Sequence, residues 1–165
     1  MKKFIRQNSF WFLMIVLFFG AQFFVKRDLV SGAPPLIQAF TVTGAPFELK
    51  QLEGEPALLY FWASWCGICD AMDEGIESLS ADYAVITVAM QSGGREEVIT
   101  HLQEKGLSFP VIADASGEIS KSYGLHAVPA FFVLTPSGEI AFSGMGYTTS
   151  WGLRLRLWLV EKGFL

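Results

Sequence analysis

Apolar runs alternate with polar, glycine-containing segments along most of the chain. Ala57–Trp62 is a continuous apolar run short enough to be a buried central strand, and Ala84–Met90 is predicted as a second buried strand. A helical pattern resumes after Cys66 and continues to about Ala81. Arg95–Lys105 places its apolar residues on one face and is followed by a glycine, which predicts a second helix.

Shorter segments predict the remaining strands. Leu36–Thr43 and Pro46–Leu49 flank a Gly-Ala turn, which predicts a small N-terminal hairpin. Phe109–Ala113 is predicted as a third central strand, and a turn with a short helix follows it. Ala130–Leu134 is predicted as a fourth strand, which a Thr-Pro-Ser-Gly turn joins to a partner strand at Glu139–Ser143.

The C-terminal segment has two interpretations. Leu153–Leu157 alternates like a strand, but apolar residues across Trp151–Leu159 also recur at helical spacing. Thr149 or Ser150 is suited to cap a helix, and a terminal helix would cover the sheet, so we predict a helix over residues 150–162. Strands that alternate with helices and end in a hairpin predict an α/β fold, with a mixed central sheet flanked by helices.

One apolar run, residues 7–25, is much longer than the predicted strands. None of its 19 residues is charged. A helix of that length spans roughly 28 Å, close to the thickness of a bilayer's hydrocarbon core. A cleaved signal peptide is the alternative, but the apolar core of a signal peptide is shorter than this run and ends at a small-residue cleavage site. We therefore predict a transmembrane helix within an N-terminal anchor segment, residues 1–33, followed by an external domain, residues 34–165.

Charge and cysteine content narrow the function of the external domain. With seven basic and fifteen acidic residues, residues 34–165 carry a net charge of −8, against −4 for the whole chain. An acidic surface does not favour binding to nucleic acid, so we expect no nucleic-acid partner. Two cysteines cannot build a disulfide-rich scaffold, and alone they cannot complete a four-ligand zinc site.

Both cysteines stand in the stretch WASWCGIC, residues 62–69, where a predicted buried strand meets a predicted helix. The free N–H groups and the dipole at a helix N-terminus stabilise a thiolate and lower its pKa. Cys66 falls at or near the N-cap, and Cys69 follows within disulfide reach. We predict that Cys66 is the attacking thiolate and Cys69 the resolving thiol. A structural staple is disfavoured, because a disulfide that closes so few residues constrains little of the unfolded chain.

The stretch WASWCGIC is similar to the active-site stretch of the thioredoxin superfamily. Val128-Pro129, about 60 residues later and just before a predicted strand, resembles the cis-proline of that superfamily. The N-terminal hairpin, the additional helix and strand between Ser92 and Ala113, and the apolar leader resemble the TlpA-like branch. Residues 149–158 are similar to the closing segment of proteins of the suppressor-of-copper-sensitivity D type. The resemblance covers about residues 36–160 and implies a thioredoxin-like fold with a central insertion.

The resemblance also implies roles for residues that flank the cysteines. Pro129 is expected to be cis and to face the disulfide. The backbone of Val128 is expected to pair with a substrate strand. Trp65 is expected to shield Cys66 and to offer an apolar contact to a partner.

Departures from the superfamily pattern concern acidic residues. Tyr60 replaces the buried Asp that thioredoxins carry six residues before the first cysteine, and Met72 replaces a Glu found in many TlpA-like proteins. We interpret Tyr60 and Met72 as core residues. Asp73 and Glu74 are interpreted as solvated carboxylates, and His126 as a loop histidine.

These observations predict a thiol:disulfide oxidoreductase tethered to the cytoplasmic (inner) membrane of a bacterium, with its catalytic domain facing the periplasm. The Cys66–Cys69 pair would exchange disulfides with extracytoplasmic proteins, and a membrane redox partner would supply or remove electrons. Because the cysteine pair carries the electrons, the hypothesis requires no cofactor and no metal, and it treats the protein as a monomer. The alternative is a copper-binding or copper-delivery module that uses the same cysteines. A peroxidase is disfavoured, because the PxxxTxxC pattern is absent.

Overall fold

The computed structural model describes residues 29–164. Its centre is a five-stranded sheet in the order β5–β4–β3–β6–β7. Strands β3, β4 and β5 are parallel, β6 is antiparallel to β3, and β7 is antiparallel to β6. The strands are β3 (Ala57–Trp62), β4 (Ala84–Met90), β5 (Val111–Asp114), β6 (Ala130–Leu134) and β7 (Ile140–Met145). The predicted mixed sheet is therefore confirmed.

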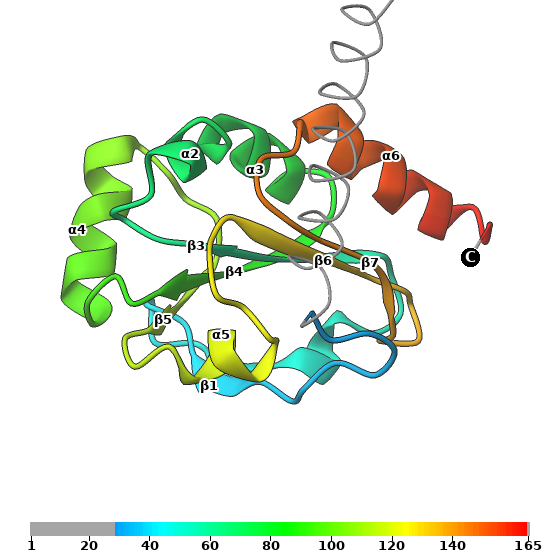
Figure 1. The fold of residues 1–165 in the computed structure, drawn as a ribbon, viewed down its shortest axis with the longest axis horizontal. Helices are drawn as coiled ribbons and strands as arrows, with labels where there is room; N and C mark the ends of the chain where they lie inside the picture. Colours follow the sequence, from blue (N-terminus) through cyan, green and yellow to red (C-terminus); the bar gives the residue numbers. More distant parts are fainter. Residues whose placement is uncertain (1–28, 165) are drawn as a thin grey trace, which may run out of the picture.

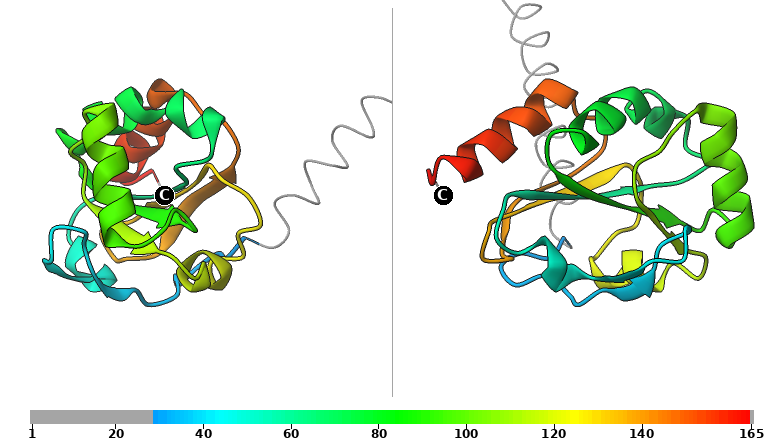
Figure 2. Two further views of the ribbon diagram at one scale, coloured as in Figure 1. Left: turned by 90° about the vertical axis from the view of Figure 1, so that its left-hand side faces the viewer. Right: turned by 180° about the vertical axis from the view of Figure 1, so that it is seen from behind.

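Helices and loops cover both faces of this sheet (Figures 1 and 2). One face packs against α2 (Gly67–Asp70), α3 (Asp73–Ser80), α4 (Arg95–Lys105) and α6 (Ser150–Glu161). The opposite face packs against α5 (Glu118–Ser122), the 3-10 helix η1 (Leu49–Leu52) and the hairpin of β1 (Gln38–Phe40) and β2 (Pro46–Glu48). This arrangement is the predicted α/β fold, with the N-terminal hairpin in place.

The central strand β3 explains why its sequence is continuously apolar. Side chains alternate between the two faces of a strand. Leu58, Tyr60 and Trp62 enter the core beneath α3 and α6, whereas Leu59 and Phe61 enter the core on the α5 side. Since helices or loops cover both faces, every side chain of β3 is buried. The run therefore shows no polar alternation.

The helix predicted from Cys66 to about Ala81 is wrong in one respect, because the structure contains two helices. Helix α2 ends at Asp70 and α3 begins at Asp73. Ala71 and Met72 form a turn between them, in which the Met72 N–H donates to the Cys69 carbonyl at 2.8 Å. The buried residues still follow helical spacing across this break, so the apolar pattern does not reveal it; they are Cys69, Met72, Ile76 and Leu79. The 3-10 helix η1 was also not predicted.

The predicted C-terminal helix is confirmed. It begins after Thr149, whose hydroxyl oxygen accepts the N–H of Gly152 at 3.1 Å. Leu153 and Leu157 are buried against the core. Leu155 lies between them in sequence and is exposed, so the alternation that suggested a strand here belongs to a helix.

The predicted membrane anchor, residues 7–25, lies outside the described residues. Within residues 29–164, no helix is both long enough and apolar enough to cross a bilayer.

Residues that precede the predicted domain boundary at residue 34 already contact the folded domain. The N–H of Val30 donates to the carbonyl of Tyr123 at 3.4 Å, and Gly32 forms a bridge with Ile140 of β7.

Candidate active site

Strand pairing brings the predicted site residues to one end of the sheet. Strand β3 ends at Trp62, and the antiparallel register places Phe61 opposite the first residue of β6. The chain that leaves β3 toward Cys66 and the chain that enters β6 through Pro129 therefore meet at this end. Two segments about 60 residues apart in sequence form one site for this reason.

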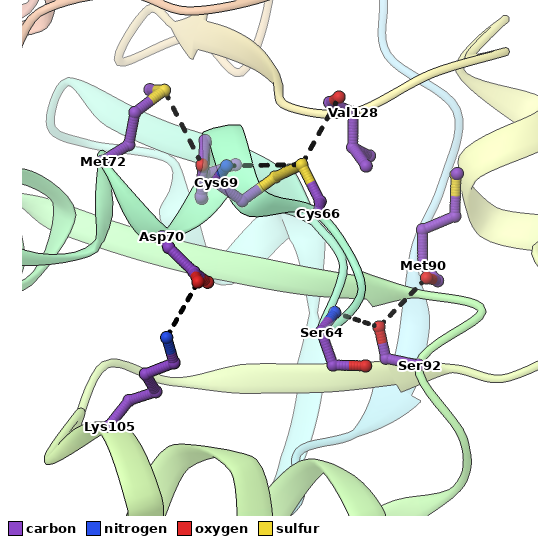
Figure 3. The surroundings of a disulfide bond; sticks show 10 residues. Ser64, Cys66, Cys69, Asp70, Met72, Met90, Ser92, Lys105 and Val128 are labelled. Atoms are coloured by element: carbon purple, nitrogen blue, oxygen red, sulfur yellow. Dashed lines mark hydrogen bonds and ion pairs between the residues drawn. A yellow bond between two sulfur atoms is a disulfide. The ribbon is translucent and has the colours of Figure 1, made fainter.

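The two cysteines form a disulfide at the start of α2, with Cα atoms 5.3 Å apart (Figure 3). Cys66 is the N-cap of α2, as predicted, and its Sγ accepts the N–H of Cys69 at 3.3 Å. Cys66 is 8% exposed, whereas Cys69 is only 1% exposed. A partner sulfur therefore reaches Cys66 more easily than Cys69. The attacking and resolving roles stay predictions.

The loop before β6 borders the disulfide. The Val128–Pro129 peptide bond is cis, as expected. The carbonyl oxygen of Val128 lies 3.7 Å from Cys66 Sγ (Figure 3). Pro129 is buried and Val128 is half-buried, so Val128 is the more accessible of the two beside the sulfur. His126, in the same loop, is exposed as interpreted from the sequence.

Apolar side chains project from the disulfide loop. Trp65 is 60% exposed, and its indole N–H donates to the carbonyl of Gln91 at 3.1 Å. Ile68, between the two cysteines, is 55% exposed. An accessible indole and an accessible aliphatic side chain next to the sulfur atoms offer apolar contact to a partner. The expected role of Trp65 in shielding Cys66 stays a prediction.

Tyr60 and Met72 are buried core residues, as interpreted from the sequence. The Tyr60 hydroxyl lies 3.9 Å from Met72 Sδ, with the hydroxyl as donor. Burial, with a smaller contribution from Asp73, raises the pKa of Tyr60 well above its ordinary value of 10. Tyr60 is therefore neutral at physiological pH and does not serve as a base there.

The interpretation of Asp73 as a solvated carboxylate is wrong. Asp73 is only 6% exposed, whereas its neighbour Glu74 is exposed. Asp73 follows Cys69 by four residues and precedes Ile76 by three, which is the spacing of the buried helical face. This spacing could have indicated that Asp73 is buried, but acidic residues are more often exposed to solvent.

Several charged groups act on the buried carboxyl of Asp73. Burial raises its pKa above the ordinary value of 3.8, and the neighbouring carboxylate Asp70 raises it further. Lys105 and His101, both on α4, act in the opposite direction. Lys105 also forms an ion pair with Asp70 at 2.8 Å (Figure 3). A buried carboxyl group with a raised pKa, close in sequence to the cysteine pair, is a candidate functional group.

A mixed sheet with a CxxC pair at a strand–helix junction, beside a cis-proline, defines a thioredoxin-like protein of the thiol-disulfide oxidoreductase class. Residues 31–143 match the AhpC/TSA family, and the chain belongs to that family.

Known relatives agree with this assignment. A thioredoxin-like protein of Haemophilus influenzae is 31% identical over 162 residues, covering 97% of this chain and 96% of that protein. The thiol-disulfide oxidoreductase ResA of Halalkalibacterium halodurans is 25% identical over 150 residues, covering 82% of this chain and 85% of its own. The crystal structure of StoA from Bacillus subtilis has a TM-score of 0.64 and 26% identity, over 75% of this chain and 97% of that one. These relatives support the TlpA-like branch; the suppressor-of-copper-sensitivity D resemblance stays a prediction.

Proposed function

We propose that the protein exchanges disulfides with extracytoplasmic proteins through the Cys66–Cys69 pair. The observation that carries the proposal is the placement of Cys66 at the N-cap of α2, with its sulfur within reach of the Cys69 N–H. This N–H and the helix dipole favour the thiolate, which is the attacking species in thiol–disulfide exchange. The exposed side chains of Trp65 and Ile68 leave an apolar surface for the partner next to that sulfur.

In the reducing direction, the exchange proceeds in two steps. The Cys66 thiolate attacks one sulfur of a partner disulfide, forms a mixed disulfide and releases the other partner sulfur as a thiolate. The Cys69 thiol then loses its proton and attacks Cys66 Sγ. This attack closes the intramolecular disulfide and releases the second partner sulfur. Two electrons pass to the partner, and the reverse sequence oxidises a partner dithiol.

The second step needs a base for the buried Cys69 thiol. Tyr60 and Met72 cannot accept that proton at neutral pH. Asp73 is a buried carboxyl at the start of α3, four residues after Cys69, and it interacts electrostatically with Tyr60. We assign Asp73 the role of proton acceptor for Cys69, because burial raises the pKa of its carboxyl above the ordinary value and makes it a stronger base than a solvated carboxylate.

Replacing Asp73 by Asn is expected to slow resolution of the mixed disulfide by about 10²-fold. The folded protein binds the Asp73 proton more tightly than the unfolded chain does. The stability linked to this group is therefore complete below its ordinary pKa of 3.8 and decreases as pH rises through the higher folded value. Asp73→Asn should thus increase the free energy of unfolding at pH 7 relative to the unsubstituted protein, but not at low pH.

Single-turnover release of partner thiol, together with urea unfolding at several pH values, tests this prediction. Glu74→Gln is the matched control, because Glu74 is the adjacent exposed carboxylate and should change neither quantity. Resolution at the original rate in Asp73→Asn would remove Asp73 from the proton transfer.

The proposal places the domain on the outer side of the cytoplasmic membrane, held by residues 7–25 as a single transmembrane helix. The uncharged length of that run supports this location, as does the excess of basic residues on its N-terminal side. A domain tethered in this way would meet both a membrane redox partner and extracytoplasmic protein thiols at the outer surface of that membrane. We treat the domain as monomeric.

Trapping with Cys69→Ser tests the proposed function. Without the resolving thiol, mixed disulfides through Cys66 should accumulate on partner proteins in the native membrane and should disappear on reduction. The Cys66→Ser/Cys69→Ser double variant is the control and should trap nothing. A Cys69→Ser protein that traps no protein, while the unsubstituted reduced protein binds Cu(I) tightly, would contradict the proposal and favour the copper-binding module.

A further inference from the structure

The loop after β4 lies against the disulfide loop. Strand β4 is parallel to β3, with Ala89 opposite Trp62, so residues 90–92 leave the sheet at the same end as the site. Within this loop, the Ser92 hydroxyl oxygen accepts the backbone N–H of Ser64 at 2.9 Å and donates to the carbonyl of Met90 at 3.1 Å (Figure 3). Ser92 is only 6% exposed. One buried hydroxyl therefore joins the two loops.

A second hydrogen bond joins the same two loops. The indole N–H of Trp65 donates to the carbonyl of Gln91. Gln91 has φ +46°, a left-handed backbone conformation that is uncommon outside glycine. Its own N–H donates to the carbonyl of Asp114 at 2.9 Å, which ties the loop to the end of β5. Two consecutive residues of the disulfide loop, Ser64 and Trp65, are thus held by Ser92 and Gln91.

The position of Ser64 and Trp65 determines where Cys66 lies. The N–H of Cys66 donates to the carbonyl of Ala63 at 3.1 Å, so residues 63–66 form one turn. Ser64 and Trp65 are the middle residues of this turn. Its last residue places Sγ near the Cys69 N–H and the Val128 carbonyl. A shift of the turn would therefore move the sulfur away from the N–H that stabilises its thiolate.

We infer that Ser92 is a positioning residue for the attacking cysteine: its hydroxyl holds the 63–66 turn so that Cys66 Sγ stays at the N-terminus of α2. The inference rests on the proposed function only in taking Cys66 as the attacking sulfur. The hydrogen bond from the Ser92 hydroxyl to the Met90 carbonyl stabilises only the end of β4. The second hydrogen bond, which the hydroxyl oxygen accepts from the Ser64 N–H, stabilises the disulfide loop as well.

Alkylation of Cys66 by iodoacetamide as a function of pH tests this inference. The measurement uses the Cys69→Ser protein, in which Cys66 is the single remaining thiol and the backbone N–H at position 69 is retained. Adding Ser92→Ala should lower the Cys66 alkylation rate at pH 6 by about fivefold or more, because less of the thiol is ionised. The rates should converge at about pH 10, where the thiol ionises without help.

Two further variants separate positioning from stability. Ser92→Thr keeps the hydroxyl and should restore the original pH profile. Thr87→Val removes another buried hydroxyl with the same bonding pattern, which accepts the Trp62 indole N–H at 3.1 Å and donates to the Pro110 carbonyl at 3.0 Å. Thr87 does not bond the 63–66 turn, so Thr87→Val should reduce the melting temperature without changing the profile.

An alkylation profile of Ser92→Ala that matches that of the unsubstituted serine, with only a lower melting temperature, would overturn the inference. If Ser92→Ala does not fold, Trp65→Phe loosens the same turn, because its smaller ring lacks the N–H that donates to Gln91. It should also lower the rate at pH 6, and an unchanged rate would overturn the inference. The assay contains no partner protein. A failure of the trapping experiment is therefore distinguishable from a failure of this one.

Discussion

Cys66→Ser is expected to abolish disulfide exchange, with catalytic reduction of a disulfide-bonded reporter peptide falling at least about 10³-fold. A serine hydroxyl is not ionised at neutral pH and cannot form the mixed disulfide, so the first step is lost. Cys69→Ser should behave differently. It keeps the thiolate at the N-cap, and should release one equivalent of reporter thiol before it stops as the mixed disulfide.

Rapid-mixing measurement of reporter thiol release distinguishes the two variants. The unsubstituted protein should turn over repeatedly when a small dithiol re-reduces it. Repeated turnover by Cys66→Ser, or a stoichiometric burst from it, would show that Cys69 attacks partners directly. That result would reverse the roles assigned from the N-cap position and from the lower exposure of Cys69.

Phe132→Ala is expected to lower the free energy of unfolding by about 3–5 kcal/mol. Phe132 is fully buried in β6, and its ring packs edge-on against Phe61 at 5.8 Å and Tyr123 at 5.0 Å. The substitution leaves a cavity in the core on the α5 side of the sheet. Loss of these aromatic contacts adds to the cost of that cavity.

Urea unfolding of the oxidised protein measures this loss. Phe40→Ala is the matched control, because Phe40 is 71% exposed and its removal should change the free energy of unfolding by less than about 0.5 kcal/mol. A loss below about 1 kcal/mol for Phe132→Ala would contradict the packing described for this core.

Much of the fold could be predicted because the central strands are buried on both faces. Ala57–Trp62 and Ala84–Met90 match β3 and β4 in full, since strands covered on both sides form nearly continuous apolar runs with clear ends. The cysteine pair was predictable for a related reason. The apolar run ends at Trp62, and the helical pattern begins after Cys66. Together they mark the strand–helix junction in the sequence.

Features that depend on contacts between distant segments could not be predicted. The break between α2 and α3 leaves the spacing of buried residues unchanged, so it produces no change in the apolar pattern. Asp73 belongs to a residue type that is mostly exposed, so its identity does not reveal its burial. The bond from Ser92 to Ser64 joins residues 28 apart and follows only from the parallel pairing of β3 with β4.

The reduction potential of the Cys66–Cys69 pair tests the central claim most directly. Equilibration with glutathione or dithiothreitol buffers, followed by quantification of free thiols, gives this potential. A pair that exchanges with protein thiols should titrate reversibly as a two-electron couple above about −300 mV, the limit below which structural disulfides resist reduction. A disulfide that stays closed in buffers at about −300 mV would contradict the account, because it would act as a staple rather than as a redox centre.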